Sequence, residues 1–324
     1  MAPRDGPACC GGDGIGSVTQ LYTHSCFLEH DTGPHHPERP DRLKAVLHAL
    51  EAPAFVDLDR LEAPAATREQ IERVHRPAQV DGVLQSIPQS GLANIDADTA
   101  VSPRSAVAAF HAAGALCAAV DAVVEGAAPN AFCAVRPPGH HAEPSRAMGF
   151  CLFNSVAVGA MQARMAHGLE RVAVVDVDVH HGNGTQAFAW DDPNFFYAST
   201  HQMPLYPGSG GVTERGGGNI VNAPLQPGAD GKIFRAVVSE TVIPALRRFA
   251  PEIVMISAGF DAHARDPLAN LNLVAEDYAW VTRELMAVAE DVAEGRVVSC
   301  LEGGYDLDAL AESAAAHVLA LIGQ

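Results

Sequence analysis

The stretch that decides the fold is residues 172–183, which read VAVVDVDVHHGN. Its first four residues are all apolar, which predicts a strand covered on both faces, as strands of a parallel sheet are. Side chains alternate between the faces of a strand, so Asp176, Asp178 and His180 project to the same side at its end. Burying three such polar groups without a cation would be costly. We therefore predict a metal site here, in preference to a surface strand with one polar face.

Similar apolar runs alternate with helical patterns along most of the chain. Strands are predicted at residues 18–22, 131–135, 172–177, 195–199, 253–257 and 297–301. Helices are predicted at residues 39–50, 103–124, 154–166, 232–249, 275–293 and 307–321. The second helix is expected to have Ser102 as its cap and Pro103 at its first position. Strands separated by helices indicate one α/β domain, with a parallel sheet that has helices on both faces.

The composition of the 324 residues is that of a globular protein, with 48% hydrophobic and 19% charged residues. Residues 1–16 lack the apolar core of a signal peptide and read as a flexible head before a domain at residues 17–324. Because no apolar run reaches about 18 residues, we expect no membrane span. The formal charge of −18 argues against direct nucleic-acid binding, which needs clustered Lys and Arg. An acidic surface could attract a cationic substrate such as a lysine-rich tail or a polyamine, but solubility is the favoured interpretation of the charge.

The seven cysteines are an odd number and contain no CxxC pair. Several, such as Cys133 and Cys300, lie in apolar surroundings. We therefore expect buried free thiols in a reducing compartment and not a disulfide framework. A cytoplasmic location follows as an expectation.

A second motif, residues 254–267 (VMISAGFDAHARDP), again runs from an apolar strand into an acid. Asp261 could join Asp178 and His180 as a third ligand and leave one coordination position open for water. Three protein ligands with an open position are typical of a catalytic zinc site. His263 could also join the metal, but we favour a place at the rim of the site.

A third motif, residues 136–144 (RPPGHHAEP), places His140 and His141 side by side in a loop after a strand. Imidazole titrates near neutral pH, so one or both histidines are candidates for general acid or base groups. A metal role is the competing interpretation.

A fourth motif, residues 299–306 (SCLEGGYD), has two glycines after a strand. The glycines let the backbone turn sharply and bring Tyr305 to the same rim. A phenol is a suitable donor to a developing oxyanion. Taken alone this motif is weak, since an exposed loop tyrosine is the default.

Together the four motifs resemble, in order and spacing, those of the zinc-dependent histone deacetylase family, over roughly residues 17–322. Residues 36–43 (HPERPDRL) and 149–156 (GFCLFNSV) resemble it as well. The resemblance implies a single arginase/deacetylase-like domain with an eight-stranded parallel sheet. It also implies a catalytic domain that removes acetyl or related acyl groups from lysine side chains of proteins or peptides.

The resemblance implies two metal sites. One zinc ion per chain would be held by Asp178, His180 and Asp261. The residues that match the family's structural potassium site are Asp176, Asp178 and Ser199, with the backbone at His180 and Thr200.

The resemblance also implies catalytic roles. His141 would be the general base that activates water and then the acid that protonates the leaving amine. His140 would be an electrostatic partner oriented by Asp176. Asn183 stands behind His141 where class I enzymes have an aspartate, which is typical of class II. Tyr305 would polarise the acyl carbonyl together with zinc.

The substrate would occupy a narrow channel. Phe150 and Tyr206 are expected to line it, and the Gly149 carbonyl would accept the substrate amide N–H. The remaining substrate-binding positions are Asp98, Leu268 and Gly304.

Three alternatives stay open. An acetylpolyamine deacetylase would carry an acidic gatekeeper where this chain has Leu268. A ureohydrolase would need acids for a second metal where Asn183 and His263 stand. An inactive acyl-lysine reader would need neither the histidine pair nor Tyr305. The residues leave open the physiological substrate, zinc against iron, and a possible homo-oligomer.

Overall fold

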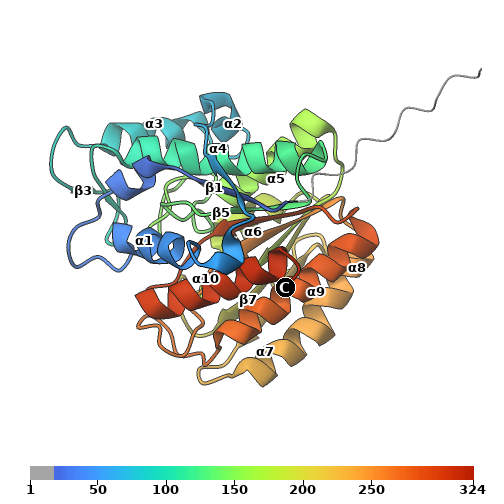
Figure 1. Ribbon diagram of the computed structural model, residues 1–324. Helices are drawn as coiled ribbons and strands as arrows, with labels where there is room; N and C mark the ends of the chain where they lie inside the picture. Colours follow the sequence, from blue (N-terminus) through green and yellow to red (C-terminus); the bar gives the residue numbers. More distant parts are fainter. Residues whose placement is uncertain (1–17) are drawn as a thin grey trace, which may run out of the picture.

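The protein, described by a computed structural model over residues 18–324, has a central eight-stranded sheet (Figure 1). All strands are parallel, in the order β2-β1-β5-β10-β9-β6-β7-β8. The strands are β1 (Gln20–Thr23), β2 (Asp59–Glu62), β5 (Asn130–Cys133), β6 (Val172–Asp176), β7 (Phe195–Gln202), β8 (Ile220–Leu225), β9 (Ile253–Ala258) and β10 (Val297–Leu301). A separate antiparallel pair is formed by β3 (Ala93–Asn94) and β4 (Ala100–Val101). The head expected at residues 1–16 lies outside the described residues.

Helices cover both faces of the sheet, as predicted (Figure 1). One layer holds α2 (Arg68–Glu72), α3 (Pro77–Ser86), α4 (Ser105–Val124) and α5 (Ser155–His167). The other holds α1 (Pro40–Ala49), α7 (Gly231–Val237), α8 (Ile243–Phe249), α9 (Ala275–Val292) and α10 (Leu307–Leu321). The short α6 (Asn183–Ala189) packs on β7 and α5. Short turns of other helix types are η1 (Ser25–Glu29), η2 (Pro53–Phe55) and η3 (Val238–Val242).

The register of the central strands brings their carboxyl ends to one edge. Asp176, the last residue of β6, pairs with Ser199 in β7 and with Ser257 in β9. Every residue of β5, β6, β9 and β10 is buried, because helices cover both faces. Ligands of open parallel sheets bind beyond the carboxyl ends of the strands, so the loops after these four strands form the functional edge.

Two strands absent from the sequence prediction, β2 and β8, are the edges of the sheet. β2 reads DRLE and is largely exposed, and β8 contains Pro224. Edge strands tolerate charge and proline, so they lack the continuous apolar run that identifies a buried strand.

Two helix predictions were wrong in detail. The helix expected from residue 103 begins at Ser105, and Ser102 does not cap it: the Ser102 N–H donates to Ser105 Oγ (2.8 Å), and Pro103 lies in the preceding turn. The helix expected at 232–249 is divided into α7, the π-helical turn η3 and α8. Pro244 has no N–H to continue a regular α-helical ladder, which accounts for the break just before it.

Helix α4 is the one helix within residues 18–324 that is long and apolar enough to cross a membrane by length and composition alone. In its most apolar window 61% of residues are buried, and it packs against α5 and β5. Core helices pass the same test, so this property is weak support for a membrane span. The five described cysteines are buried and free, as predicted; Cys9 and Cys10 lie outside the described residues.

A fully buried ion cluster ties the first helix to the functional edge. Glu38 accepts from Arg42 Nη1 at 2.9 Å and from Arg136 Nη2 at 2.7 Å, and none of the three side chains is exposed. Burial alone would raise the pKa of Glu38, but Arg136 and Arg42 hold it well below its usual range. Arg136 begins the loop that carries the histidine pair. Arg42 also donates to the carbonyls of Glu302 and Gly304, both at 2.5 Å.

Replacing Glu38 with Ala should therefore be strongly destabilising. The substitution leaves two buried guanidinium groups without a counter-charge, and we expect the free energy of unfolding to fall by about 3–5 kcal/mol. Urea denaturation followed by circular dichroism measures it. Glu51→Ala, in an exposed pair with His48, is the matched control and should change stability by less than about 0.5 kcal/mol. Equal stability of both variants would contradict a structural role for the cluster.

Candidate active site

Three side chains of metal-binding type meet at the functional edge. Asp178 and His180 lie in the loop after β6, and Asp261 lies in the loop after β9. Their ligand atoms all lie within 4.8 Å of one another. His180 Nδ1 is 3.2 Å from Asp178 Oδ1 and 3.0 Å from Asp261 Oδ2, and neither carboxylate is exposed. The structure thus gathers the three residues predicted to hold zinc.

Backbone groups hold both carboxylates in place. Gly303 N–H donates to Asp178 Oδ2 (2.8 Å), and Val179 N–H donates to Asp261 Oδ1 (2.7 Å). A Cβ at Gly303 would overlap both acids, so glycine is required where the loop after β10 approaches them. Three loops therefore meet around this pair of acids.

The charges of this group fit a divalent cation. Burial and the neighbouring Asp178 raise the pKa of Asp261 to about 7. Burial opposes a charged His180, but Asp178 and Asp261 outweigh it and raise its pKa to about 10. Two buried carboxylates thus draw positive charge to this point. Two oxygen ligands and one nitrogen ligand suit zinc and other first-row divalent ions.

The two adjacent histidines have opposite electrostatic surroundings. His140 Nδ1 lies 3.0 Å from Asp176 Oδ2, whereas His141 Nδ1 lies 2.8 Å from the neutral amide oxygen of Asn183. Burial disfavours the charged form of His140, but Asp178 and Asp176 outweigh it and raise its pKa well above 6.5. Burial, together with His140 and His180, lowers the pKa of His141 well below 6.5. The surroundings therefore favour a charged His140 and a neutral His141.

A channel of about 240 Å³ leads to this group. Its walls are formed by Asp98, His141, Gly149, Phe150, His180, Leu205, Tyr206, Leu268 and Tyr305. The Phe150 ring lies 5.9 Å from that of Tyr305, and the His141 ring lies 5.1 Å from that of Tyr206, both edge to face. The aromatic walls end at the histidines, so an extended chain that enters the channel reaches the metal-binding group.

The other predicted positions are placed as follows. Leu268 and Asp98 line the channel, whereas Gly304 does not; its carbonyl accepts from Arg42. Ser199 lies beside Asp176 in the sheet register, and Thr200 Oγ1 is buried with no hydrogen-bond partner among residues 18–324. The assignment of these residues to potassium stays a prediction.

The expected place of His263 at the rim was wrong. Its ring is only 6% exposed, and Nε2 lies 3.1 Å from Glu312 of α10. The residue neither lines the channel nor belongs to the metal-binding group. Packing of α10 against the loop after β9 covers it, a contact that the local sequence does not show.

Two acids of the site were missed by the sequence analysis. Buried Glu302 accepts the N–H groups of Gly139 (2.7 Å) and His140 (3.2 Å), and burial raises its pKa to about 7. Asp266 accepts the N–H groups of Tyr305 (2.7 Å) and Leu268 (2.9 Å). Both lie inside the quoted motifs. Glu302 directly follows the apolar strand β10, which was an available signal, whereas Asp266 lies in the loop after β9 and had none.

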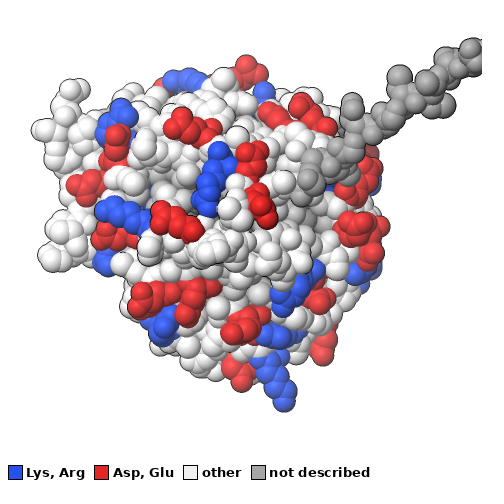
Figure 2. Space-filling view, viewed as in Figure 1, with Lys and Arg blue, Asp and Glu red and all other residues white. Residues whose placement is uncertain are grey.

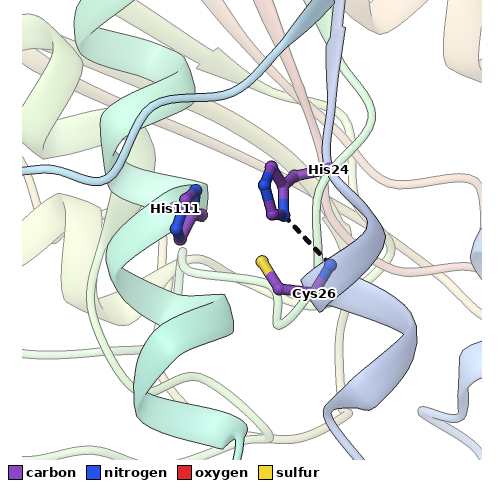
Figure 3. A group of neighbouring side chains, drawn as sticks. All are labelled: His24, Cys26 and His111. Atoms are coloured by element: carbon purple, nitrogen blue, oxygen red, sulfur yellow. Dashed lines mark hydrogen bonds between the residues drawn. The ribbon is translucent and has the colours of Figure 1, made fainter.

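A second group in the described part of the chain has metal-binding residue types: His24, Cys26 and His111 (Figure 3). The Nδ1 atoms of both histidines already take part in hydrogen bonds. His24 Nδ1 accepts the Cys26 N–H (3.0 Å), and His111 Nδ1 donates to the Ala63 carbonyl (2.7 Å). Burial raises the pKa of the Cys26 thiol to about 11, and the two imidazoles stack with their centroids 4.3 Å apart. A cation here would have to ionise a buried thiol, so this group fits a metal less well than the Asp178 group.

The fold and the site together define a hydrolase of the deacetylase type. The chain belongs to the histone deacetylase domain family, whose model matches residues 36–321.

Several relatives are similar over most of their length. The chain is 40% identical to a histone deacetylase-like amidohydrolase of Pseudomonas aeruginosa, covering 89% of this chain and 81% of that protein. It is 39% identical to histone deacetylase 14, chloroplastic, of Arabidopsis thaliana, covering 94% and 77%. The solved structure of the HDA15 HD domain superposes with a TM-score of 0.90 at 35% identity, over 95% of this chain and 90% of that one.

The metal assignment can be tested by composition. Asp261→Ala removes one of three ligands and should abolish both tightly bound metal and activity. Elemental analysis of purified protein measures the first. His263→Ala is the control and should keep one metal equivalent per chain. One equivalent of tightly held zinc in Asp261→Ala would contradict the assignment.

The two histidines should differ in kinetic effect. His141→Ala removes the neutral imidazole and should lower kcat by on the order of a hundredfold or more, with metal content unchanged. Because its lowered pKa keeps His141 unprotonated well below pH 6.5, the acidic limb of the parent pH profile should lie below that value. His140→Ala should be milder. If His141→Ala kept near-normal turnover and His140→Ala were inactive, His140 and not His141 would be the general base.

Proposed function

We propose that this protein is a zinc-dependent amidohydrolase that removes acetyl or related acyl groups from lysine side chains of proteins or peptides. The observation that carries the proposal is the channel itself. Its inner end joins the Asp178–His180–Asp261 group, the neutral His141 and Tyr305 in one place. Histone deacetylase names among the relatives agree with it. A structural potassium ion beside Asp176 and Ser199 is part of the same proposal.

Bound zinc would supply a Lewis acid that polarises the acyl carbonyl and lowers the pKa of water. His141 then takes the water proton at Nε2, because its Nδ1 faces the Asn183 oxygen. The same nitrogen returns that proton to the leaving amine. His140 keeps its charge through Asp176 and stabilises the negative charge of the transition state.

Tyr305 is the donor for the carbonyl oxygen as charge develops on it. Its backbone is fixed by Asp266, and Arg42 lies 4.9 Å from its ring centroid. Phe150 and Tyr206 form apolar walls that exclude water from the methylene chain of the substrate. An amide is hard to cleave, so a positioned base and an oxyanion donor are both needed.

Two features bear on the substrate class: the side chain of Leu268 in the channel wall and the distribution of charge on the surface. Leu268 is half-buried in the channel wall, and its apolar side chain offers nothing to the second ammonium of a polyamine. Acidic and basic side chains are interspersed on the face drawn in Figure 2, with no basic cluster that would suit phosphate. A peptide is therefore the favoured substrate, and an acetylated polyamine is the alternative.

Substrate preference gives the test. The parent should have a higher kcat/KM for acetyl-lysine peptides than for acetylated polyamines. Leu268→Glu should move the ratio toward polyamines by roughly tenfold to a hundredfold, since a partly desolvated ion pair contributes on the order of 1–3 kcal/mol. Side-by-side kinetics on both substrates and both proteins measure it.

Val56→Glu is the control, because it adds the same charge at a position that is 77% exposed and outside the channel wall. Its ratio should match the parent. An unchanged ratio in Leu268→Glu would defeat the gatekeeper role. A parent preference for polyamines would defeat the proposed substrate, and acyl-lysine binding without any turnover would favour a reader.

A further inference from the structure

The amide of Asn183 is held in one orientation by its neighbours. Its Oδ1 faces His141 Nδ1 at 2.8 Å. Its Nδ2 faces three acceptors: Glu143 Oε1 at 2.7 Å, the His141 carbonyl at 3.4 Å and Met148 Sδ at 3.4 Å. The Glu143 carboxylate is the shortest of these contacts and the charged one. Hydrogen bonds to charged acceptors are about twice as strong as neutral ones, so Glu143 dominates the choice of orientation.

The orientation matters because the two ends of an amide are not equivalent. A carboxylate at position 183 would accept from His141 with either oxygen, whereas an asparagine accepts only with Oδ1. A half-turn of the Asn183 amide would point its oxygen at the Glu143 carboxylate and its N–H groups at His141 Nδ1. His141 would then accept at Nδ1 and carry its proton on Nε2, so no lone pair would face the channel.

Glu143 is itself well fixed for this task. Its N–H donates to the Arg146 carbonyl (2.9 Å), and its own carbonyl accepts from His75 Nδ1 (2.9 Å). Arg146 Nη2 lies 3.2 Å from Glu143 Oε1. The side chain is 28% exposed and touches neither the channel nor the metal-binding group. Its side-chain carboxylate contacts the amide of Asn183, which in turn contacts His141.

We propose that Glu143 is a positioning residue that fixes the tautomer of His141 by orienting the Asn183 amide. This inference rests on the proposed function for the base role of His141, but the tautomer itself does not depend on activity. A carboxylate at position 183 would accept from His141 Nδ1 in either orientation. With asparagine at that position, Glu143 selects the orientation in which the amide oxygen is the acceptor.

Nuclear magnetic resonance tests the tautomer directly. In metal-free protein labelled with ¹⁵N-histidine, long-range ¹H–¹⁵N correlations distinguish a proton on Nδ1 from one on Nε2, and His141→Ala identifies the His141 signals. The parent and Glu143→Gln should hold the proton on Nδ1, because a glutamine oxygen still accepts from Asn183. Glu143→Ala should populate the Nε2 form substantially. Persistence of a pure Nδ1 form in Glu143→Ala would overturn the inference.

Kinetics give an independent readout. Glu143→Ala should lower kcat by more than twofold and up to about tenfold, with KM within about twofold, since kcat follows the fraction of His141 in the Nδ1–H form and the lost bond biases the orientation by roughly tenfold. Glu143→Gln and the control Arg146→Ala should stay within about twofold of the parent. Glu143→Leu, which keeps most of the side-chain volume, replaces Glu143→Ala if that variant fails to fold.

A double substitution separates positioning from a merely structural role. In an Asn183→Asp background the amide no longer needs orienting, and Glu143→Ala removes a carboxylate that would lie about 2.7 Å from the new one, so adding Glu143→Ala should not lower kcat. An equal loss in both backgrounds would overturn the inference. If the parent hydrolyses no acyl-lysine substrate, the proposed function fails, whereas the tautomer measurement still decides the role of Glu143.

Discussion

Two carboxylates that water does not reach, those of Asp178 and Asp261, constrain the whole functional edge. Neither can stay ionised at this depth without a positive partner and donors for its oxygens. The donors are backbone N–H groups from loops that follow β6 and β10, the closest of which requires glycine at position 303. Neutralising this pair therefore fixes three loops at once, and the neighbouring strands β10, β9 and β6 carry those loops to the same place.

The division of labour between His140 and His141 is a consequence of the same constraint. His140 lies beside Asp176 and within 3.8 Å of Asp178, so the acids that need a cation also keep this imidazole charged. A second charged imidazole next to it, with ring centroids 4.0 Å apart, would be repelled. Asn183, a neutral acceptor, stabilises the Nδ1–H of His141 without adding negative charge. An acid at position 183 would favour protonation of His141 and would thereby reduce the difference in charge between the two histidines.

The sequence predicts the centre of this fold better than its periphery, for a physical reason. Strands such as β6 and β9 are buried on both faces and must be continuously apolar, and period-two alternation then identifies the polar ends that become the site. The edge strand β2 has no such requirement, and its DRLE sequence carries no strand signal. The positions of Glu302 and Asp266 were not predicted because their partners are backbone groups, which leave no residue pattern. Glu302, for instance, accepts from Gly139, 163 residues earlier.

One turn in the channel wall, at Gly149 and Phe150, contains a residue that the backbone conformation of the turn disfavours. Met148 and Cys151 exchange two backbone hydrogen bonds around Gly149 and Phe150, and both central residues have positive φ, 58° and 67°. A two-residue turn of this kind favours glycine or asparagine at both positions, and a phenylalanine there costs on the order of 1–3 kcal/mol. Gly149 satisfies the turn and the close contact with the His141 ring. Phe150 is not a residue that the turn favours, but the strained backbone places its ring in the channel wall near Tyr305. The residue at this position is thus explained by where its side chain lies and not by the turn that holds it.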